Sequence, residues 1–124
     1  MVNKLKGKDI WVVIAAFNEG RVIKNVIESL MEMVDHVLVV NDCSSDVTTD
    51  ISLLAGARVL EHIENLGQGA AIQTGIDYAL TMGAKYIVTF DGDGQHDPSD
   101  LVNMYEKSIA DKLKIFYIAV IIFL

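Results

Sequence analysis

The sequence predicts an α/β fold, an open and mostly parallel sheet with helices on both faces. Two runs, Ile10–Ala16 and Val37–Val40, are apolar throughout, without the alternation of a strand that has one exposed face. Continuous apolar runs of this kind are typical of parallel strands that helices cover on both sides. Each run is followed by apolar residues at helical spacing, and strands that alternate with helices indicate βαβ units.

The first helix is predicted after Glu19, and the second after a polar loop at residues 41–46. The loop offers several residues that can cap a helix. In the short second helix, we expect Ile51 and Leu54 to face inward and Gly56 to end the helix. The inner face of the first helix is predicted by apolar residues three and four positions apart: Val22, Ile23, Val26, Ile27, Leu30 and Met31.

A third, short strand is predicted at Ala57–Leu60, and a loop at residues 64–69 opens the third helix. Gly83 ends this helix, and Tyr86–Phe90 is the fourth predicted strand. Small residues allow the third helix to pack close to a sheet. Its expected inner residues are Ala70, Ala71, Ile72, Gly75, Ile76, Ala79 and Leu80.

The fourth helix is predicted to begin at Pro98, with Asp97 as its cap. The apolar residues 115–124 could supply a fifth strand, and they are too few for a membrane span of about 18 residues. The expected inner face of the fourth helix consists of Leu101, Val102, Tyr105, Ile109 and Leu113.

The composition is that of one globular domain, with 124 residues of which 52% are hydrophobic and 22% charged. A net charge of −7 argues against nucleic acid as a partner, because nucleic-acid binding depends on basic patches. Cys43 is the only cysteine, so we interpret it as a small residue in a turn and expect a reducing compartment. Lysines precede Ile10, but Asn18 and Glu19 replace a signal-peptide cleavage site, which favours a buried first strand.

Polar residues follow three of the predicted strands, where an open α/β sheet binds its ligands. Asp91 and Asp93, two positions apart after an apolar strand, are expected to converge on one side of the chain. Hard oxygen donors in this arrangement suit Mg²⁺ or Mn²⁺. The alternative is a simple Gly-Asp turn. His96 either extends this metal site or is a surface or capping residue.

Two further clusters allow two interpretations each. Asn18 and Glu19 either start a helix, with Asn18 as its cap, or form a floor for a nucleobase and ribose together with the apolar face of Phe17. Asp42 either accepts a hydrogen bond from a base N–H or is a turn carboxylate. The sequence alone leaves both pairs open.

Several common site types are excluded. Gly67 and Gly69 follow the third strand, and Ile72 stands where a dinucleotide-binding loop has its third glycine. No Gly-Lys-Ser/Thr motif exists, so the chain has no P-loop. A calcium loop needs glycine and glutamate where this chain has His96 and Val102.

Four segments resemble one known family in order and spacing: 13–19 (VIAAFNE), 40–46 (VNDCSSD), 65–71 (NLGQGAA, with Thr74-Gly75 after it) and 91–98 (DGDGQHDP). They are similar to motifs of the family 2 glycosyltransferases of the GT-A fold. The branch they resemble includes dolichyl-phosphate mannosyltransferases and related polyprenyl-phosphate hexosyltransferases. The resemblance covers residues 10 to about 112.

The resemblance implies a pocket for a nucleoside diphosphate sugar, either GDP-mannose or a UDP-hexose. By this resemblance Ala15, Phe17 and Glu19 line the nucleoside pocket, and Val40 and Asp42 hold the base. Gly92 would then lie against the ribose and diphosphate.

The resemblance also implies a divalent metal, Mg²⁺ or Mn²⁺, held by Asp91, Asp93 and Gln95, which makes Asp91 and Asp93 the expected catalytic residues. The reaction would displace the nucleoside diphosphate from the sugar carbon with inversion. The acceptor would be a lipid phosphate. A cytoplasmic location, with peripheral contact to a membrane, is expected with such an acceptor.

This sequence departs from the family pattern at four positions within the motifs: Ala15 replaces a proline, Asn41 an aspartate, Cys43 a glycine and Gln68 a lysine. The similarity also stops after Asp111, where the family normally continues. We therefore expect residues 1–124 to be one truncated domain, the donor-binding half, with an apolar tail at 113–124 that promotes self-association.

Two functions other than catalysis of sugar transfer are alternatives. A module that binds the sugar nucleotide without turnover is the alternative for a chain of this length. A receiver domain is disfavoured, because receivers carry an acidic pair after the first strand, where this chain has a single glutamate, Glu19.

Overall fold

The computed structural model describes residues 5–91, 100–110 and 119–122 of the chain. The strands are β1 (Ile10–Ala16), β2 (His36–Asn41), β3 (Arg58–Glu61), β4 (Tyr86–Asp91) and β5 (Ala119–Ile122). The helices are α1 (Ile23–Met31), α2 (Thr48–Leu54), α3 (Gln68–Thr81) and α4 (Asp100–Ala110). The predicted alternation of strands and helices is confirmed, including a fifth strand near the end of the chain.

The strands form one sheet in the order β3-β2-β1-β4-β5, and each neighbouring pair is parallel. The chain adds β2 and β3 on one side of β1 and then returns to add β4 and β5 on the other side. The strand order therefore reverses at β1. In open α/β sheets, the crevice beyond the carboxyl ends at such a reversal is the usual ligand site.

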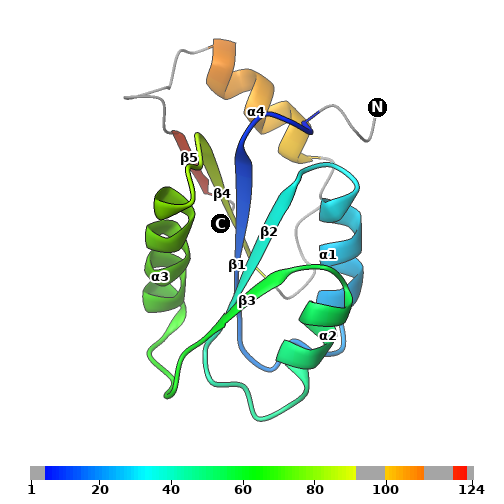
Figure 1. The fold of residues 1–124 in the computed structure, drawn as a ribbon, viewed down its shortest axis with the longest axis vertical. Helices are drawn as coiled ribbons and strands as arrows, with labels where there is room; N and C mark the ends of the chain where they lie inside the picture. Colours follow the sequence, from blue (N-terminus) through cyan, green and yellow to red (C-terminus); the bar gives the residue numbers. More distant parts are fainter. Residues whose placement is uncertain (1–4, 92–99, 111–118, 123–124) are drawn as a thin grey trace.

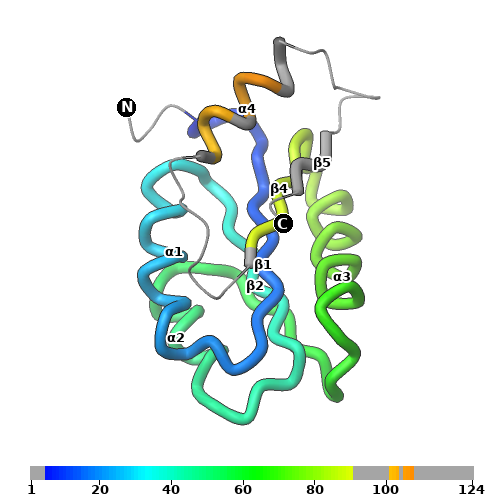
Figure 2. The backbone as a smooth tube through the Cα atoms, turned by 180° about the vertical axis from the view of Figure 1, so that it is seen from behind, coloured from blue at the N-terminus to red at the C-terminus, as the bar shows by residue number. Residues whose placement is uncertain are grey.

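Helices cover both faces of the sheet, as predicted (Figure 1). On one face, α3 packs against a cluster that includes Trp11, Val13 and Leu38. On the other face, α1 packs against the alternate residues of the strands, and Leu101 of α4 joins the same cluster. Figure 2 shows from behind that α3 lies on the opposite side of β1 from α1 and α2. Since both faces are buried, β1 is apolar along its whole length.

The small-residue face of α3 brings this helix close to the sheet. Ala71, Gly75 and Ala79 are buried. A Cβ atom on Gly75 would lie 2.2 Å from Cγ1 of Val13 on β1, so no larger residue fits there unless the helix or the Val13 side chain shifts. Leu80, which we expected on this face, is instead 40% exposed.

One prediction for α2 is wrong. Ile51 packs against the core as expected, but Leu54 is 89% exposed. The buried residues of this short helix are Thr48 and Ser52, which lie one turn apart, so Leu54 falls about 200° from Ser52 around the helix. The Ser52 hydroxyl donates to the carbonyl oxygen of Thr48, and this bond allows a polar side chain to be buried.

For α4, Leu101 is buried, and Val102 and Tyr105 pack against the core as predicted. The side chain of Ile109 and all of Leu113 lie outside the described residues. No helix among the described residues is long and apolar enough to cross a membrane.

Candidate functional site

The loops that follow β1, β2 and β3 lie together at one end of the sheet, the lower end in Figure 1. The backbone register pairs Ala15 of β1 with Val40 of β2 on one side and with Asp91 of β4 on the other. Three residues predicted to bind the nucleotide sugar or its metal therefore lie in one row across three neighbouring strands. The row lies at the carboxyl ends, where the strand order reverses.

The predicted metal ligands are only partly within the described structure. Asp91 is the last residue of β4, and its backbone position is the one just given. Gly92, Asp93, Gln95 and His96 lie outside the described residues, so the metal site stays a prediction. Among the residues that are described, no cluster of three or more His, Cys, Asp or Glu side chains could hold a metal. The backbone of Asp91 lies beside the strand-order reversal.

The loops after β1 and β2, which carry residues of the predicted nucleoside pocket, are joined by hydrogen bonds. Asn18 Oδ1 accepts from the Ser45 amide at 2.8 Å, and the Asn18 amide donates to Ser44 Oγ at 2.8 Å. The Glu19 amide donates to Thr48 Oγ1 at 3.1 Å. Phe17, directly after β1, is 46% exposed, whereas Ala15 and Val40 are buried.

Of the two interpretations of Asn18, the one in which it caps the first helix is wrong. Helix α1 begins at Ile23, five residues farther on, and its N-cap position, Val22, makes no side-chain capping bond. Asn18 instead adopts a left-handed backbone conformation, with φ of 55°, and holds the neighbouring loop. Asparagine tolerates this conformation better than most residues.

Asp46 strengthens the same connection between loops. One of its carboxylate oxygens, Oδ2, accepts from the Gly20 amide at 3.1 Å, and the other, Oδ1, accepts from the amide and the hydroxyl of Thr48. The hydrogen bond from the Thr48 hydroxyl is the main reason why the pKa of Asp46 lies below its ordinary value, against the opposing effect of burial. The hydrogen bonds at this end of the fold therefore favour the ionised carboxylate of Asp46.

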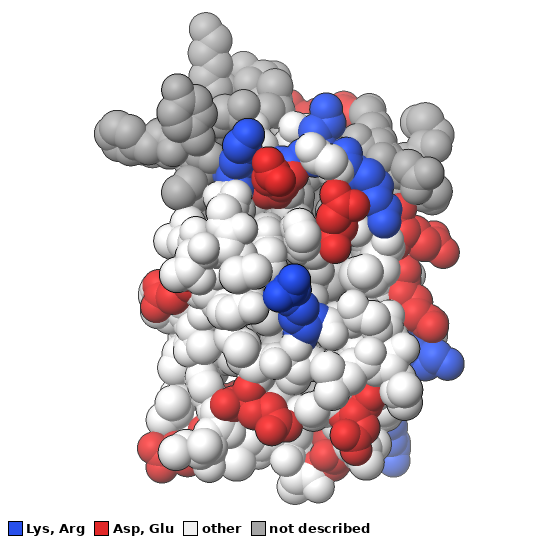
Figure 3. All heavy atoms as spheres, in the orientation of Figure 1, with Lys and Arg blue, Asp and Glu red and all other residues white. Residues whose placement is uncertain are grey.

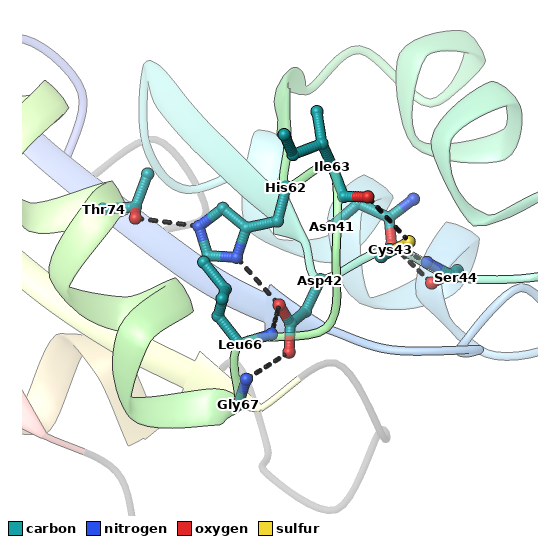
Figure 4. Close-up of polar contacts among 9 residues, drawn as sticks. All are labelled: Asn41, Asp42, Cys43, Ser44, His62, Ile63, Leu66, Gly67 and Thr74. Carbon is teal, nitrogen blue, oxygen red and sulfur yellow. Dashed lines mark hydrogen bonds and ion pairs between the residues drawn. The ribbon is translucent and has the colours of Figure 1, made fainter.

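Asp42 is 3% exposed and lies directly after β2, with its carboxylate surrounded by donors (Figure 4). Oδ1 accepts from His62 Nδ1 at 2.8 Å and from the Leu66 amide at 2.9 Å, and Oδ2 accepts from the Gly67 amide at 2.8 Å. Burial by itself raises the pKa of Asp42. The two amides and His62 together outweigh burial and hold the pKa below its ordinary value.

Asp42 thus connects the end of β2 to the loop that opens α3. A carboxylate in this position fixes that loop whether or not a nucleotide is present. The hydrogen bond to a base that the family resemblance implies is a separate role, and it stays a prediction.

His62 is the residue of this site that the sequence did not reveal. Its side chain is 9% exposed, its Nδ1 pairs with Asp42, and its Nε2 lies 2.9 Å from Thr74 Oγ1 on α3. The His62 amide also donates to the Asn41 carbonyl oxygen at 2.9 Å. The available signal was its position: it lies two residues after the end of the third predicted strand, just as Asp42 lies two residues after the end of the second.

Asn41, one of the departures from the family pattern, has a structural explanation. Its Nδ2 donates to Thr49 Oγ1 at 2.6 Å, and the Thr49 hydroxyl donates in turn to Glu61 Oε1. Its Oδ1 accepts from the Ser44 amide at 3.2 Å. An aspartate could only accept hydrogen bonds and would add a charge near Glu61, so an amide is the side chain that suits these neighbours.

Cys43, another departure, has φ of 63°, a left-handed conformation that favours the glycine of the family pattern. The residue is exposed, and its Sγ lies 3.6 Å from the Ile63 carbonyl oxygen. Its predicted place in a turn is confirmed.

Comparison with known proteins places this arrangement in context. The sequence model of the family described as Glycosyl transferase family 2 matches residues 11–123. An uncharacterized protein of Methanocaldococcus jannaschii is 42% identical over 101 residues, which cover 81% of this chain and 42% of that protein. The UDP-N-acetylglucosamine–dolichyl-phosphate N-acetylglucosaminyltransferase of Methanococcus voltae is 34% identical over 122 residues, or 84% of this chain and 49% of that enzyme.

Among solved structures, the fold is similar to glucosyl-3-phosphoglycerate synthase from Mycobacterium tuberculosis, crystallised with Mn²⁺, uridine diphosphate and glucosyl-3-phosphoglycerate. The TM-score is 0.65 at 28% identity, and the match covers 81% of this chain and 39% of that one. The chain therefore spans less than half the length of these relatives.

Proposed function

The chain belongs to glycosyl transferase family 2, and from this premise we propose that it binds the donor in a metal-dependent transfer of a hexose to a polyprenyl phosphate, with inversion. The donor is a nucleoside diphosphate sugar, GDP-mannose or a UDP-hexose. The observation that carries the proposal is the row formed by Ala15, Val40 and Asp91 at the carboxyl ends of three strands. The row lies beside the strand-order reversal, where α/β sheets bind nucleotides.

The nucleoside would lie against the loops that follow β1 and β2. Phe17 offers an exposed aromatic face, and Asp42 and Glu19 follow the two strands on which Ala15 and Val40 lie. The similarity to an enzyme crystallised with uridine diphosphate supports a nucleoside diphosphate as the ligand of this edge.

The charge of this edge supports a metal between protein and diphosphate. Figure 3 shows that acidic side chains prevail at the lower end of the face in view. The loops after β1, β2 and β3 carry Arg21 as their one cationic side chain (His62 taken as neutral), together with Glu19, Asp42, Asp46 and Glu64. A diphosphate meets repulsion here unless a cation lies between the charges.

In the proposed site, Asp91, Asp93 and Gln95 hold Mg²⁺ or Mn²⁺ against the diphosphate, with Gly92 beside the ribose. The donor set of two carboxylates and one amide oxygen fits either cation. Such a metal stabilises negative charge on the leaving diphosphate. The Mn²⁺ in the similar synthase supports this choice of cofactor.

The acceptor is proposed from the Methanococcus voltae enzyme, whose name states that it acts on dolichyl phosphate. A phosphate acceptor is anionic at neutral pH and needs little help from a base. We place the reaction at the cytoplasmic face of a membrane, with peripheral contact, because the acceptor is a lipid.

The test is nucleotide binding with and without metal. Titration calorimetry should show tighter binding of UDP or GDP with Mn²⁺ or Mg²⁺ than with EDTA. Asp93→Asn should abolish that difference, whereas Asp77→Asn, which changes an exposed carboxylate on α3, should preserve it. Equal affinities with metal and with EDTA would refute the proposed metal site.

The second candidate, a binding module without turnover, concerns residues 1–124 taken by themselves, which correspond to less than half the length of the relatives. Transfer also requires the acceptor to be held in line with the sugar carbon, and positioning can supply roughly 7–11 kcal/mol of a barrier. We therefore expect this chain alone to bind nucleotide without transferring sugar, and to self-associate through residues 113–124. Steady turnover that is lost in Asp91→Asn would overturn the first expectation, and a monomer in sedimentation measurements would overturn the second.

A further inference from the structure

The two carboxylate oxygens of Asp42 differ in the number of hydrogen bonds that they accept. Oδ1 accepts two hydrogen bonds, from His62 Nδ1 and the Leu66 amide, which is the number that a carboxylate oxygen accommodates. Oδ2 accepts one, from the Gly67 amide, within the described part of the chain. The acceptor capacity that remains on this buried carboxylate therefore belongs to Oδ2.

The hydrogen bonds also determine which nitrogen of His62 carries a proton. An ionised carboxylate can only accept, so Nδ1 must be the donor in the bond to Asp42. In the neutral ring Nε2 is then an acceptor, and the Thr74 hydroxyl is the donor that lies 2.9 Å from it. Thr74 projects from α3, which packs directly against β1 and β2. The ring is thus held at both nitrogens between β2 and α3.

We propose that His62, held by Thr74, is a positioning residue that turns Asp42 so that Oδ2 receives an N–H from the nucleobase. This inference rests on the proposed function and adds a reason for base preference. An acceptor at this point favours bases that carry an N–H there, such as N3 of uracil or N1 of guanine. It disfavours cytosine, whose N3 is itself an acceptor.

The experiment compares the affinities of UDP and CDP, two pyrimidine nucleotides of similar size, in the presence of Mn²⁺. The wild type should bind UDP more tightly. His62→Ala should reduce the ratio of the two affinities about tenfold, the change that one hydrogen bond to a charged group typically supplies. His62→Asn should retain most of the ratio, because its amide nitrogen takes the place of Nδ1.

Two controls separate positioning from general destabilisation. His36→Ala changes the histidine that stacks on Trp11 at the opposite end of β2, and it should leave the UDP/CDP ratio unchanged. Thr74→Val should lower the ratio, whereas Thr81→Val on the same helix, whose hydroxyl donates to the local Tyr78 carbonyl oxygen, should not. Thr74→Val also serves as the test if His62→Ala does not fold.

The outcomes are distinct. A folded His62→Ala variant with the wild-type ratio overturns this inference and leaves the proposed function standing, whereas a wild type that binds none of UDP, CDP and GDP overturns both. Proton–nitrogen NMR spectra provide a readout that needs no nucleotide. They should show His62 protonated at Nδ1 and unprotonated at Nε2, and the opposite tautomer would contradict the arrangement.

Discussion

Replacing Asp42 by asparagine should destabilise the fold strongly, because this buried carboxylate accepts hydrogen bonds from three donors. In Asp42→Asn, the single amide oxygen can keep the bonds of only one carboxylate oxygen. The NH₂ group then faces a donor, either the Gly67 amide or the pair formed by His62 and the Leu66 amide. A lost hydrogen bond to a charged group contributes about 1.5–3 kcal/mol, and an unsatisfied buried donor about 1–3 kcal/mol. Since these two terms overlap, we expect the free energy of unfolding to fall by about 2–4 kcal/mol.

The assay is equilibrium unfolding in urea, followed by far-ultraviolet circular dichroism. Asp77→Asn is the matched control, because Asp77 is exposed on α3 and, within the described part of the chain, its carboxylate accepts from Gln73, one turn earlier. That substitution should change stability by less than about 0.5 kcal/mol. If Asp42→Asn were as stable as this control, the carboxylate would not hold the loop, and the reasoning about His62 would lose its foundation.

Three further predictions follow from the same structure. Lowering the pH below 3.8, the ordinary pKa of Asp42 and Asp46, should reduce the free energy of unfolding, because the unfolded chain takes up protons before the folded one does. Urea unfolding midpoints measured from neutral pH downward test this prediction. The midpoint should fall less in Asp42→Asn than in the wild type, and a wild-type midpoint that does not change with pH would contradict the prediction. Gly75→Ala should destabilise by about 1–3 kcal/mol, because its Cβ would meet Val13 at 2.2 Å, whereas Gly69→Ala, with open space around it, should be neutral or stabilising. Thermal unfolding that ranks the two variants the other way would refute the close packing of α3. Cys43→Gly should stabilise the chain by up to about 1 kcal/mol, because φ is 63° there, and an unchanged or lower melting temperature would count against strain at this residue.

Sequence reasoning located most elements because their signals are local. The predicted first strand has the same bounds as β1, and the apolar spacing of the first helix identified Ile23, Val26, Ile27 and Leu30, all buried. The family motifs, with the rule that ligands bind beyond the carboxyl ends of strands, placed Ala15, Val40 and Asp91 at one edge, and the register brings their backbones side by side.

The same local reasoning failed where neighbours are distant in the chain. Leu54 looked like an inner residue by spacing, but a helix of seven residues has too few turns to define its inner face without knowing what it contacts. Asparagine is a common N-cap residue of helices, yet the Asn18 side chain accepts from the Ser45 amide, 27 residues away on the next loop.

By itself, the sequence determined the fold class, the strands and the edge of the sheet at which Ala15, Val40 and Asp91 lie, because short segments of sequence contain the signals for a strand buried on both faces and for a turn. The partners of Asp42 were decided only by the tertiary structure. The crossover connection that makes β3 parallel to β2 brings His62 beside Asp42. Gly75 allows α3 to pack close to the sheet, and this packing brings Thr74 to the other nitrogen of the His62 ring. No periodicity encodes a contact between residues 20 positions apart. Such a contact exists because the sheet aligns the ends of its strands. This alignment brings Asp42, His62 and Thr74 into one polar network that no short segment of the sequence contains.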